Sequence, residues 1–457
     1  MAAKTQPARG MRDFLPADLR RREYVIRVIR DVYERYGFEP LETPAVENIE
    51  TLLGKYGEEG NQLIFKILKR GEHEKTGEAD LALRYDLTVP LARVVAEYGD
   101  KLPRFFKRYQ IQPVWRADRP ARGRFREFYQ CDVDCIGTRS MVVEAELCGA
   151  VSDVLIKLGF NDFIIRLNHR QVLIGMLEVA GIPSNRHNDA LITIDKLDKI
   201  GPEGVERELA EKGFNSPNIP ALLEFLSFSR EDANRQQHGI GVLHRMANFL
   251  NDASPERQQG HHELAMIEQL TKSNSAGQYI RWDASLARGL SYYTGTIMEI
   301  NVPDLSGSLG GGGRYDNLVG MFSGKDIPAC GFSLGLERII FVMTERGMFP
   351  ENLGRASADV LVTVWNEESV RDSLAFAGEL RKSAPELRVA VYPEADKLGK
   401  QLKYASTLGV PFVVVIGDDE RARGEVALKD MKTGEQRTLK REQVGASLSE
   451  ALNGSVQ

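Results

Sequence analysis

The sequence predicts a mixed α/β (α+β) protein built from more than one domain. Three observations carry this prediction: a β-hairpin with a polar face at residues 107–134, helical periodicity at residues 171–275, and alternating short strands and helices after residue 358. A chain of 457 residues is long enough for about two to four domains. We expect one domain at residues 1–350, with residues 171–275 inserted into it as a helical segment, and a second at residues 358–457.

Composition and charge are those of an ordinary globular protein. The chain has 42% hydrophobic and 27% charged residues, and no apolar run reaches the length of a membrane span. Its net charge of −5 gives no overall signal for nucleic-acid binding, so any such contact must come from local basic patches. The N-terminus lacks the apolar core of a signal peptide. We therefore expect a cytoplasmic protein.

The cysteines give no sign of a metal site. They are Cys131, Cys135, Cys148 and Cys330. Cys131 and Cys135 stand four apart within a predicted strand, which is not the usual spacing of a zinc site, and no pair of histidines lies near them. Reduced thiols are the plain interpretation.

The first expected element is an amphipathic helix at residues 18–36, where apolar residues recur at helical spacing. Asp18 is its expected N-cap, and Gly37 is the expected glycine after its C-terminus. Residues 38–44 follow as an extended segment. Its two prolines exclude a central place in a sheet, which predicts an edge strand or a packing surface. A long helix that leads into such an edge is compatible with a dimer interface.

The stretch at residues 107–134 alternates with a period of two, as a β-hairpin does, around a turn at residues 119–123. One face carries polar side chains and one aromatic ring: Gln110, Gln112, Arg116, Asp118, Arg124, Arg126, Phe128, Gln130, Asp132 and Asp134. An exposed sheet surface would explain such a face. A substrate platform would explain it equally well, with arginines for phosphate, an aromatic ring for stacking, and carboxylates and an amide for a small polar ligand.

Residues 81–90 read as a strand that leads into a helix at residues 91–98. Asp86 and Thr88 share one face between them. Their simplest role is to cap the helix that follows. Together they could also hold an ammonium group, because a carboxylate and a hydroxyl both accept hydrogen bonds from one.

After the hairpin, residues 141–158 are expected to be helical and residues 161–168 to form a buried strand. The helical insertion follows, and the β pattern returns at residues 279–283 and in the second half of residues 288–300. The first half of that last stretch places Arg288 beside Tyr292 and Tyr293.

Residues 308–316 contain four consecutive glycines and read as a glycine-rich turn that ends in Arg314, Tyr315 and Asp316. A flexible linker is one interpretation. The other is close approach of the backbone to a ligand or to a neighbouring strand. No lysine follows in the arrangement of a phosphate-binding P-loop, so a site of that type is not expected.

Residues 331–338 form a predicted strand that runs into a helix, with Arg338 in the helix's first turn. An arginine there opposes the helix dipole, so we expect it to meet an anion or another local partner.

Beyond a boundary near residues 350–357, short strands and helices alternate: strand 359–365, helix 369–382, strand 388–393, helix 397–408 and strand 411–417. A hairpin at residues 425–439 and a last helix complete this region. Such alternation predicts a parallel or mixed sheet with helices on its faces.

With these residues in view, the chain resembles the histidyl-tRNA synthetase family of class II aminoacyl-tRNA synthetases over nearly its whole length. Residues 18–36 with Pro44 are similar to motif 1, which forms the dimer interface in the family. Residues 107–134 are similar to motif 2 and residues 331–338 to motif 3. Two further stretches, 288–293 and 312–318, resemble the family's histidine-specific motifs. Residues from about 358 resemble its anticodon-binding domain.

The resemblance implies a fold and an activity. The fold would be a class II catalytic domain built on an antiparallel sheet, with a helical insertion and a C-terminal α/β anticodon-binding domain. The activity would be ATP-dependent attachment of L-histidine to tRNA(His) through a histidyl-adenylate, with release of AMP and pyrophosphate. A homodimer is implied, and Mg²⁺ would accompany the ATP phosphates.

The resemblance also implies roles for single residues. Arg116 and Arg288 would be catalytic, holding the α-phosphate from two sides. ATP would be bound by Arg116, Asp118, Phe128 and Arg338, with the adenine between Phe128 and Arg338. Histidine would be bound by Asp86, Leu87, Thr88, Gln130, Asp134, Tyr292, Tyr293 and Tyr315. In that set Asp86 and Thr88 would take the α-ammonium, and Asp134 would accept from a ring N–H.

The chain departs from the family pattern in two places. Relatives often carry aspartate where this chain has Ser291, and many carry glutamate where it has Asp118. The resemblance assigns no role to Asp132. Two alternatives share much of the pattern: a catalytically silent regulatory relative that binds histidine, and another class II synthetase with the same C-terminal domain. The anticodon-binding region argues against the first, and the histidine motifs argue against both.

Overall fold

The protein is described from a computed structural model that covers residues 5–69, 76–234, 240–251, 253–287, 292–350, 353 and 356–453. The chain divides into two compact units, Met1–Phe349 and Pro350–Gln457. Each unit is described by itself below.

The first unit is built on a sheet whose described strands have the order β1-β5-β6-β11-β10-β9-β7-β8. Their bounds are β1 Glu39–Pro40, β5 Phe106–Trp115, β6 Glu127–Ile136, β7 Ile164–His169, β8 Ile280–Trp282, β9 Thr296–Asn301, β10 Gly310–Arg314 and β11 Ala329–Gly335. Neighbouring strands are antiparallel from β5 to β7. Only the outermost described pairs, β1 with β5 and β7 with β8, are parallel. The sheet is therefore antiparallel where it is most central.

A smaller sheet of described strands, β2 Val46–Asn48, β4 Ala79–Leu83 and β3 Lys66–Leu68, lies in the same unit. The short helices α2 Ile49–Leu52 and α3 Gly57–Gln62 lie between β2 and β3, and the longer α4 Thr88–Tyr98 follows β4. The sequence predicted this strand and helix, but the helix begins three residues earlier than expected.

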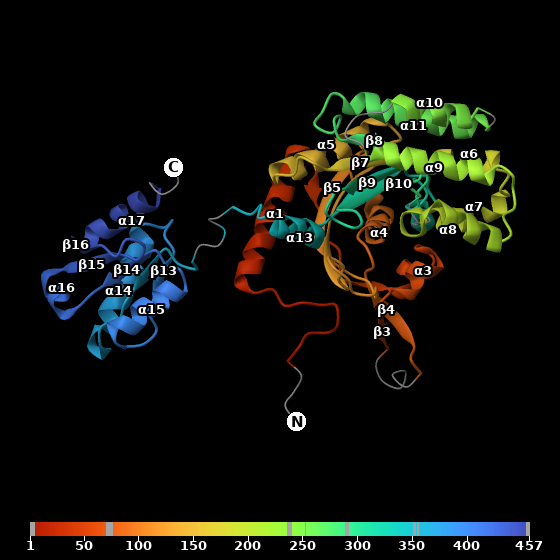
Figure 1. The fold of residues 1–457 in the computed structure, drawn as a ribbon. Helices are drawn as coiled ribbons and strands as arrows, with labels where there is room; N and C mark the ends of the chain where they lie inside the picture. The colour runs from red at the N-terminus through yellow and green to blue at the C-terminus, as the bar shows by residue number, and fades with distance from the viewer. Residues whose placement is uncertain are drawn as a thin grey trace. The chain divides into compact units, whose positions relative to one another are not determined.

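Three longer helices pack on the main sheet or on one another. They are α1 Pro16–Arg35, α5 Val142–Lys157 and α13 Leu336–Glu345, and a single turn, α12 Gly320–Ser323, precedes β11. Between β7 and β8 the regular elements among the described residues are helices: α6 Arg170–Val179, α7 His187–Ile194, α8 Leu197–Glu211, α9 Ile219–Ala233, α10 Ile240–Phe249 and α11 Pro255–Thr271. Figure 1 shows α6–α11 gathered beside β7 and β8, away from α1 and α13.

The ends of α1 test two local predictions. The helix begins at Pro16 with Leu15 as its N-cap, so the prediction of Asp18 as N-cap was wrong; Asp18 lies in the first turn. Proline is well suited to the first helical position, where its missing N–H is not needed. At the other end Gly37 has φ +74°, and the N–H groups of Gly37 and Phe38 donate to the carbonyls of Glu34 and Tyr33. This is a Schellman motif, which confirms the predicted glycine stop.

The glycine run is not a turn. Gly310–Arg314 is strand β10, paired on both sides with β9 and β11. The reason is the close approach of its neighbours. A Cβ atom on Gly312 would lie 2.1 Å from the carbonyl oxygen of Gly331, and one on Gly331 would lie 1.8 Å from Oδ1 of Asp134. The interpretation as a flexible linker was therefore wrong, and the alternative of a closely approached strand is confirmed.

The second unit is a mixed sheet whose described strands have the order β13-β12-β14-β15-β16. Their bounds are β12 Val360–Val362, β13 Val389–Val391, β14 Phe412–Val415, β15 Glu425–Asp430 and β16 Gln436–Lys440, with helices α14 Val370–Ser383, α15 Leu398–Thr407, α16 Asp418–Arg423 and α17 Val444–Asn453. Val360 and Val362 join one apolar cluster while Leu361 joins another, so both faces of the sheet are covered. This confirms the predicted mixed sheet, to which the sequence had not added α16.

No helix among the described residues is both long enough and apolar enough to cross a membrane.

The tight packing of β10 on β11 can be tested by adding one methyl group. We expect Gly312→Ala to lower the free energy of unfolding by about 1–3 kcal/mol or more, because backbone atoms on β11 cannot move aside. Gly99→Ala is the matched control, since a Cβ there would meet nothing within 4 Å. Denaturant unfolding of both variants measures the difference, and equal stability would contradict this account of the strand.

Candidate active site

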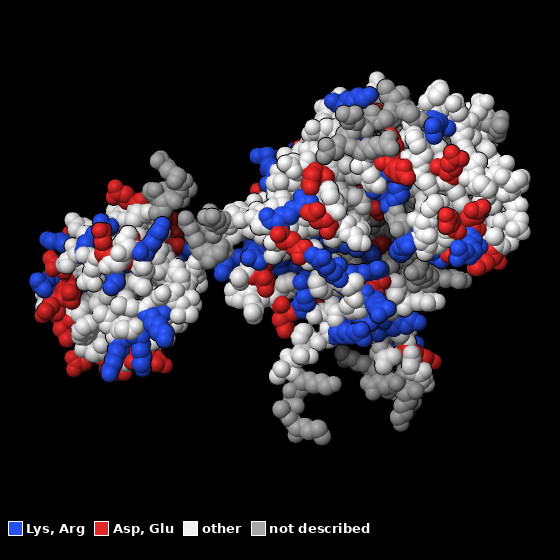
Figure 2. Space-filling view, viewed as in Figure 1, with Lys and Arg blue, Asp and Glu red and all other residues white. Residues whose placement is uncertain are grey.

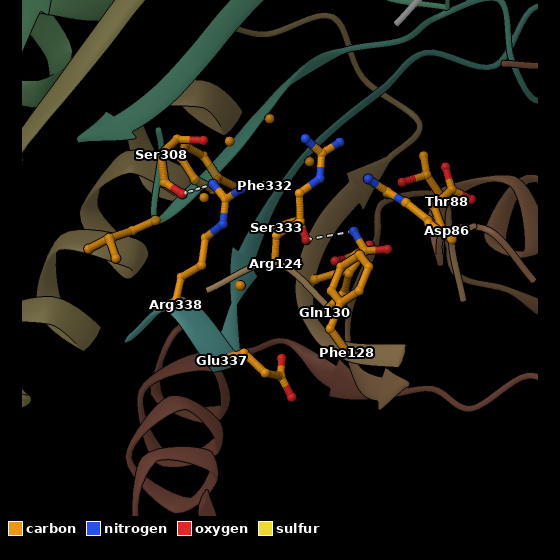
Figure 3. Close-up of a pocket in the computed structure, with 18 of the residues that line it drawn as sticks. Asp86, Thr88, Arg124, Phe128, Gln130, Ser308, Phe332, Ser333, Glu337 and Arg338 are labelled. Atoms are coloured by element: carbon orange, nitrogen blue, oxygen red, sulfur yellow. Dashed lines mark hydrogen bonds between the residues drawn. The ribbon is translucent and has the colours of Figure 1, made fainter. Parts of the chain in front are cut away.

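A cavity of about 290 Å³ opens over the middle strands of the main sheet. Its lining comes from β6, β10 and β11 and from the hairpin turn that precedes β6. Asp86, which lies between β4 and α4, and Tyr292, which lies between β8 and β9, also line it. Figure 3 shows the side chains converging from these strands and from the start of α13. The cavity thus gathers segments that lie far apart in the sequence.

The polar face of the predicted hairpin lines this cavity rather than solvent. The side chains that do so are Arg116, Asp118, Arg124, Phe128, Gln130, Asp132 and Asp134. Gln130 is 8% exposed, and Asp132 and Asp134 are 2% exposed. The interpretation as an exposed sheet surface was therefore wrong for the inner part of the hairpin. Gln110, Gln112 and Arg126, on the same face, lie outside the cavity lining.

The residue that the sequence reasoning missed is Arg108. It is completely buried on β5, directly opposite Asp134 on β6. Its Nη2 lies 2.9 Å from a carboxylate oxygen of Asp134 and 3.9 Å from one of Asp132. The signal was present in the sequence, because Arg108 has the same parity as Gln110 and therefore shares the polar face.

Burial raises the pKa values of the carboxylates near Arg108. It raises the pKa of Asp132 to about 7, although the charge of Arg108 opposes the change. Burial also raises the pKa values of Asp134 and Asp86, again against nearby arginine charge. A carboxylate that is taken out of water favours its neutral form. The cavity therefore buries acidic side chains whose charged forms are disfavoured, as binding sites often do.

Asp86 performs the capping role and also faces the cavity. Its Oδ1 accepts from the N–H of Val89 at 3.1 Å and from the hydroxyl of Tyr56 at 2.9 Å. Its Oδ2 is buried and has no hydrogen-bond partner among the described residues. Thr88, the first residue of α4, lines the cavity beside it. Leu87 does not: its side chain is fully buried elsewhere, and its carbonyl accepts from Arg108 at 3.4 Å.

Three tyrosines close the same end of the cavity. Tyr315 donates a hydrogen bond to Asp134. Tyr292 packs against both Tyr293 and Tyr315, with ring centroids 5.0 and 6.1 Å apart. The three predicted tyrosines thus meet around Asp134, although they come from two separate stretches of sequence.

Two arginines with different surroundings, Arg116 and Arg338, also line the cavity, and Arg116 lies near the carboxylate of Asp86. Arg116 donates to the carbonyl of Tyr85 at 3.0 Å, and its guanidinium lies 5.2 Å from the ring of Phe128. Arg338 donates to the carbonyl of Ser308, which satisfies the expected local partner at the start of α13. Figure 3 shows Phe128 and Arg338 rising from opposite sides of the same opening.

Asp118 is paired before any ligand arrives. Both of its carboxylate oxygens accept from Arg124, at 2.9 and 3.0 Å. Glu337, next to Arg338, is likewise engaged by Arg22 at 2.7 Å and by the N–H of Tyr129 at 2.9 Å.

Arg288 and Ser291 lie outside the described residues. The chain that leads to Arg288 is well anchored. Asn168 donates to the carbonyls of Ala284 and Leu286 at 3.1 and 3.0 Å, and the N–H of Ala284 donates to Ser229 on α9 at 2.8 Å.

Among the described residues, no cluster of three or more His, Cys, Asp or Glu side chains is arranged to hold a metal ion. The described cysteines are all free and buried.

An antiparallel sheet whose cavity is lined by arginines, buried carboxylates and tyrosines agrees with the expected class, the class II aminoacyl-tRNA synthetases. Comparison with known proteins agrees. Residues 10–339 match the family model for histidyl-tRNA synthetase, and residues 359–451 match that for the anticodon binding domain. The chain belongs to the histidyl-tRNA synthetase family, and it is an aminoacyl-tRNA synthetase.

Individual relatives match over nearly the full length. The histidine–tRNA ligase of Gloeobacter violaceus is 43% identical, over 94% of this chain and 95% of its own. That of Porphyromonas gingivalis is 42% identical, over 94% and 96%. The crystal structure of histidyl-tRNA synthetase from Nostoc sp. PCC 7120 is similar with a TM-score of 0.79 and 31% identity, covering 98% of this chain and all of that one.

The raised pKa of Asp132 predicts that the free energy of unfolding depends on pH. Between its ordinary pKa of 3.8 and its raised value of about 7, the native state binds more protons than the unfolded state, so the free energy of unfolding falls as pH rises. Asp132→Asn removes this effect. We expect the variant to be more stable than the parent at about pH 8, with a smaller gain at about pH 5. Denaturant unfolding at both pH values measures it.

Glu211→Gln is the control for the loss of one carboxylate, because Glu211 is exposed. We expect it to leave the pH dependence of the free energy of unfolding unchanged. An Asp132→Asn variant that is less stable than the parent at both pH values would show that the carboxylate supports the fold.

Proposed function

We propose that the cavity binds ATP and L-histidine side by side, joins them as histidyl-adenylate with release of pyrophosphate, and then passes histidine to tRNA(His) with release of AMP. The observation that carries this proposal is that one cavity brings two arginines, Arg116 and Arg338, together with buried acceptors on Asp86, Gln130 and Asp134. The family relationship indicates the same reaction.

Activation is an in-line attack of the histidine carboxylate on the α-phosphorus of ATP. Such a step needs positioned reactants and neutralisation of negative charge more than proton transfer. Arg116, held by the carbonyl of Tyr85, is oriented to contact the α-phosphate and the carboxylate. Arg288 is proposed to approach the same phosphate from the other side, as the family resemblance implies.

The adenine is proposed to lie between Phe128 and Arg338, where an aromatic ring and a guanidinium can stack on its two faces. Asp118 would face its edge. Because Arg124 already occupies both oxygens of Asp118, we infer that Asp118 acts on adenine together with Arg124.

The α-ammonium of histidine is proposed to bind Asp86 and Thr88, and its imidazole to lie among Gln130, Asp134, Tyr293 and Tyr315. Unpartnered Oδ2 of Asp86 and Oε1 of Gln130 are buried acceptors that a ligand with several N–H groups would satisfy. Tyr292 would support the pocket through its contacts with both other tyrosines. The side chain of Leu87 lies away from the cavity, so it is proposed to contribute through its backbone, beside Asp86.

Mg²⁺ is proposed to enter with ATP, held chiefly by the phosphates, because no group of three or more ligating side chains comes together among the described residues. The ion would neutralise phosphate charge while the arginines orient the same groups.

The remaining assignments follow the family. Residues 1–350 are proposed to be the catalytic domain, residues 171–275 its helical insertion, and residues 358–457 the anticodon-binding domain. Figure 2 shows Lys and Arg side chains gathered on the visible face of the first unit, which suits contact with the phosphates of tRNA. A homodimer in the cytoplasm is proposed, with α1 and the edge strand β1 at the dimer interface.

The exchange of labelled pyrophosphate into ATP tests the reaction. We expect exchange to depend on histidine and on Mg²⁺. Exchange with a different amino acid, or none at all, would contradict the proposal.

Arg288→Ala is expected to lower the exchange rate by about 10²–10³-fold, because removal of one preorganised group that stabilises a developing negative charge typically slows a reaction by that factor. Arg207→Ala is the matched control, since Arg207 is an exposed arginine on α8. Turnover within twofold of the parent in Arg288→Ala would refute the role given to this residue.

Removal of residues 358–457 separates the two half-reactions. We expect histidine-dependent exchange to survive better than charging of tRNA(His), because the activation cavity lies entirely within the first unit. Measuring both rates on the same preparation checks this. Equal loss of exchange and charging would contradict the proposed division of labour.

A further inference from the structure

Asp132 is a buried carboxylate of the cavity lining that has no role in the proposed reaction. It is 2% exposed, and burial raises its pKa although Arg108 lies 3.9 Å away. An ionisable group held at such a cost to stability calls for a functional explanation. Its surroundings supply one.

Asp132 is connected to Gln130 through a single hydroxyl. Ser333 on β11 stands directly opposite Asp132 on β6, near enough for its hydroxyl to lower the pKa of the Asp132 carboxyl, and Oδ1 of Asp132 has no hydrogen-bond partner among the described residues. The amide nitrogen Nε2 of Gln130 donates to Oγ of Ser333 at 2.9 Å, as Figure 3 shows. The other end of the amide, Oε1, is buried at the cavity and has no hydrogen-bond partner among the described residues.

While Asp132 is ionised, the hydrogen bonds that run from Gln130 through Ser333 to Asp132 can have only one direction. A carboxylate can only accept, so the single proton of Ser333 must point to Asp132. Oγ of Ser333 can then only accept, and it must receive an N–H of Gln130. The NH₂ group of Gln130 is thereby fixed toward Ser333, and its carbonyl oxygen is fixed toward the ligand.

We propose that Asp132 is a positioning residue which, through Ser333, holds the Gln130 amide with its oxygen toward histidine. This inference rests on the proposed function and deepens it. With the amide so held, the cavity presents an acceptor to an N–H group of the substrate. With the amide reversed, its NH₂ group would face those N–H groups, and two donors would oppose each other.

The other groups around Asp132 cannot take over this task. Arg108 approaches it from β5 but is engaged with Asp134, Gln110 and the carbonyl of Leu87. Asp134 and Asp86 are acceptors that raise the pKa of Asp132 by repulsion, and Tyr33 approaches from α1. The hydrogen bond that Ser333 accepts comes from Gln130 and from none of these groups.

The first test is Asp132→Asn at about pH 8, where the parent carboxylate is charged. An asparagine can donate to Ser333, so the chain of donors can run in either direction and the Gln130 amide is no longer fixed. We expect the KM for histidine to rise by roughly 10–100-fold, with kcat and the KM for ATP within about twofold of the parent, because one buried polar contact is mispaired. The readout is histidine-dependent pyrophosphate exchange.

A rescue variant makes the test specific. Gln130→Glu in the Asp132→Asn background places acceptor oxygens at both ends of the side chain at position 130, so its orientation no longer matters. The introduced asparagine can donate to Ser333, and Ser333 can donate to the introduced glutamate, while the total charge is unchanged. We expect the KM for histidine to return to within about threefold of the parent. A residue that merely filled space at position 132 would not be rescued by this exchange.

Three outcomes would overturn the inference: an unchanged KM for histidine in Asp132→Asn, equal increases in the KM values for histidine and ATP, or no recovery in the double variant. If Asp132→Asn does not yield folded protein, Ser333→Ala carries the same test, because it breaks the connection and leaves the carboxylate in place. Failure of the parent enzyme to use histidine would instead refute the proposed function, so the two failures are distinguishable.

Discussion

The ion pair between Arg108 and Asp134 is the interaction on which the rest of the cavity depends. It joins β5 to β6 at the buried end of the hairpin. The same guanidinium lies near Asp132 and donates to Gln110 and to the carbonyl of Leu87. Removal of a charge partner from such a buried group typically costs several kcal/mol. Arg108 therefore lets the sheet keep two neighbouring carboxylates in its interior, and in the proposed function one of them, Asp134, accepts from an N–H group of the ligand.

The order of side chains along the hairpin face of the cavity follows from strand alternation. Arg116 and Phe128 occupy the outer part of the hairpin, while Gln130 and Asp134 lie two and six residues further along the same face of β6 than Phe128. A nucleotide and an amino acid can thus be laid end to end on one surface without any moving part. The tyrosines close the inner end, and Arg338 covers the outer end from α13.

The sequence predicted much of this because side chains alternate between the two faces of a strand, and this alternation can be followed in the sequence alone. Arg116, Phe128, Gln130 and Asp134 were all placed on one face, and the joint order of motifs led to the family. The errors have physical causes. Arg108 was passed over because its importance comes from a cross-strand partner, and the glycine run was taken for a turn because local sequence does not show how closely β11 approaches. Leu87 lies in a motif whose neighbours face the cavity while its own side chain packs in the core.

The part of the cavity wall formed by β10 and β11 contains glycines that the neighbouring strands approach too closely for any side chain. A Cβ atom on Gly312, Gly313 or Gly331 would lie within 2.4 Å of backbone or carboxylate oxygens. Every amino-acid replacement of a glycine adds at least that atom, so this wall cannot change by small steps. A change of amino-acid specificity in such a protein would have to proceed through the tyrosines and the amide on the other side, where side chains can be exchanged one at a time. The sheet thus fixes the inner boundary of the pocket and leaves its recognition chemistry free to evolve.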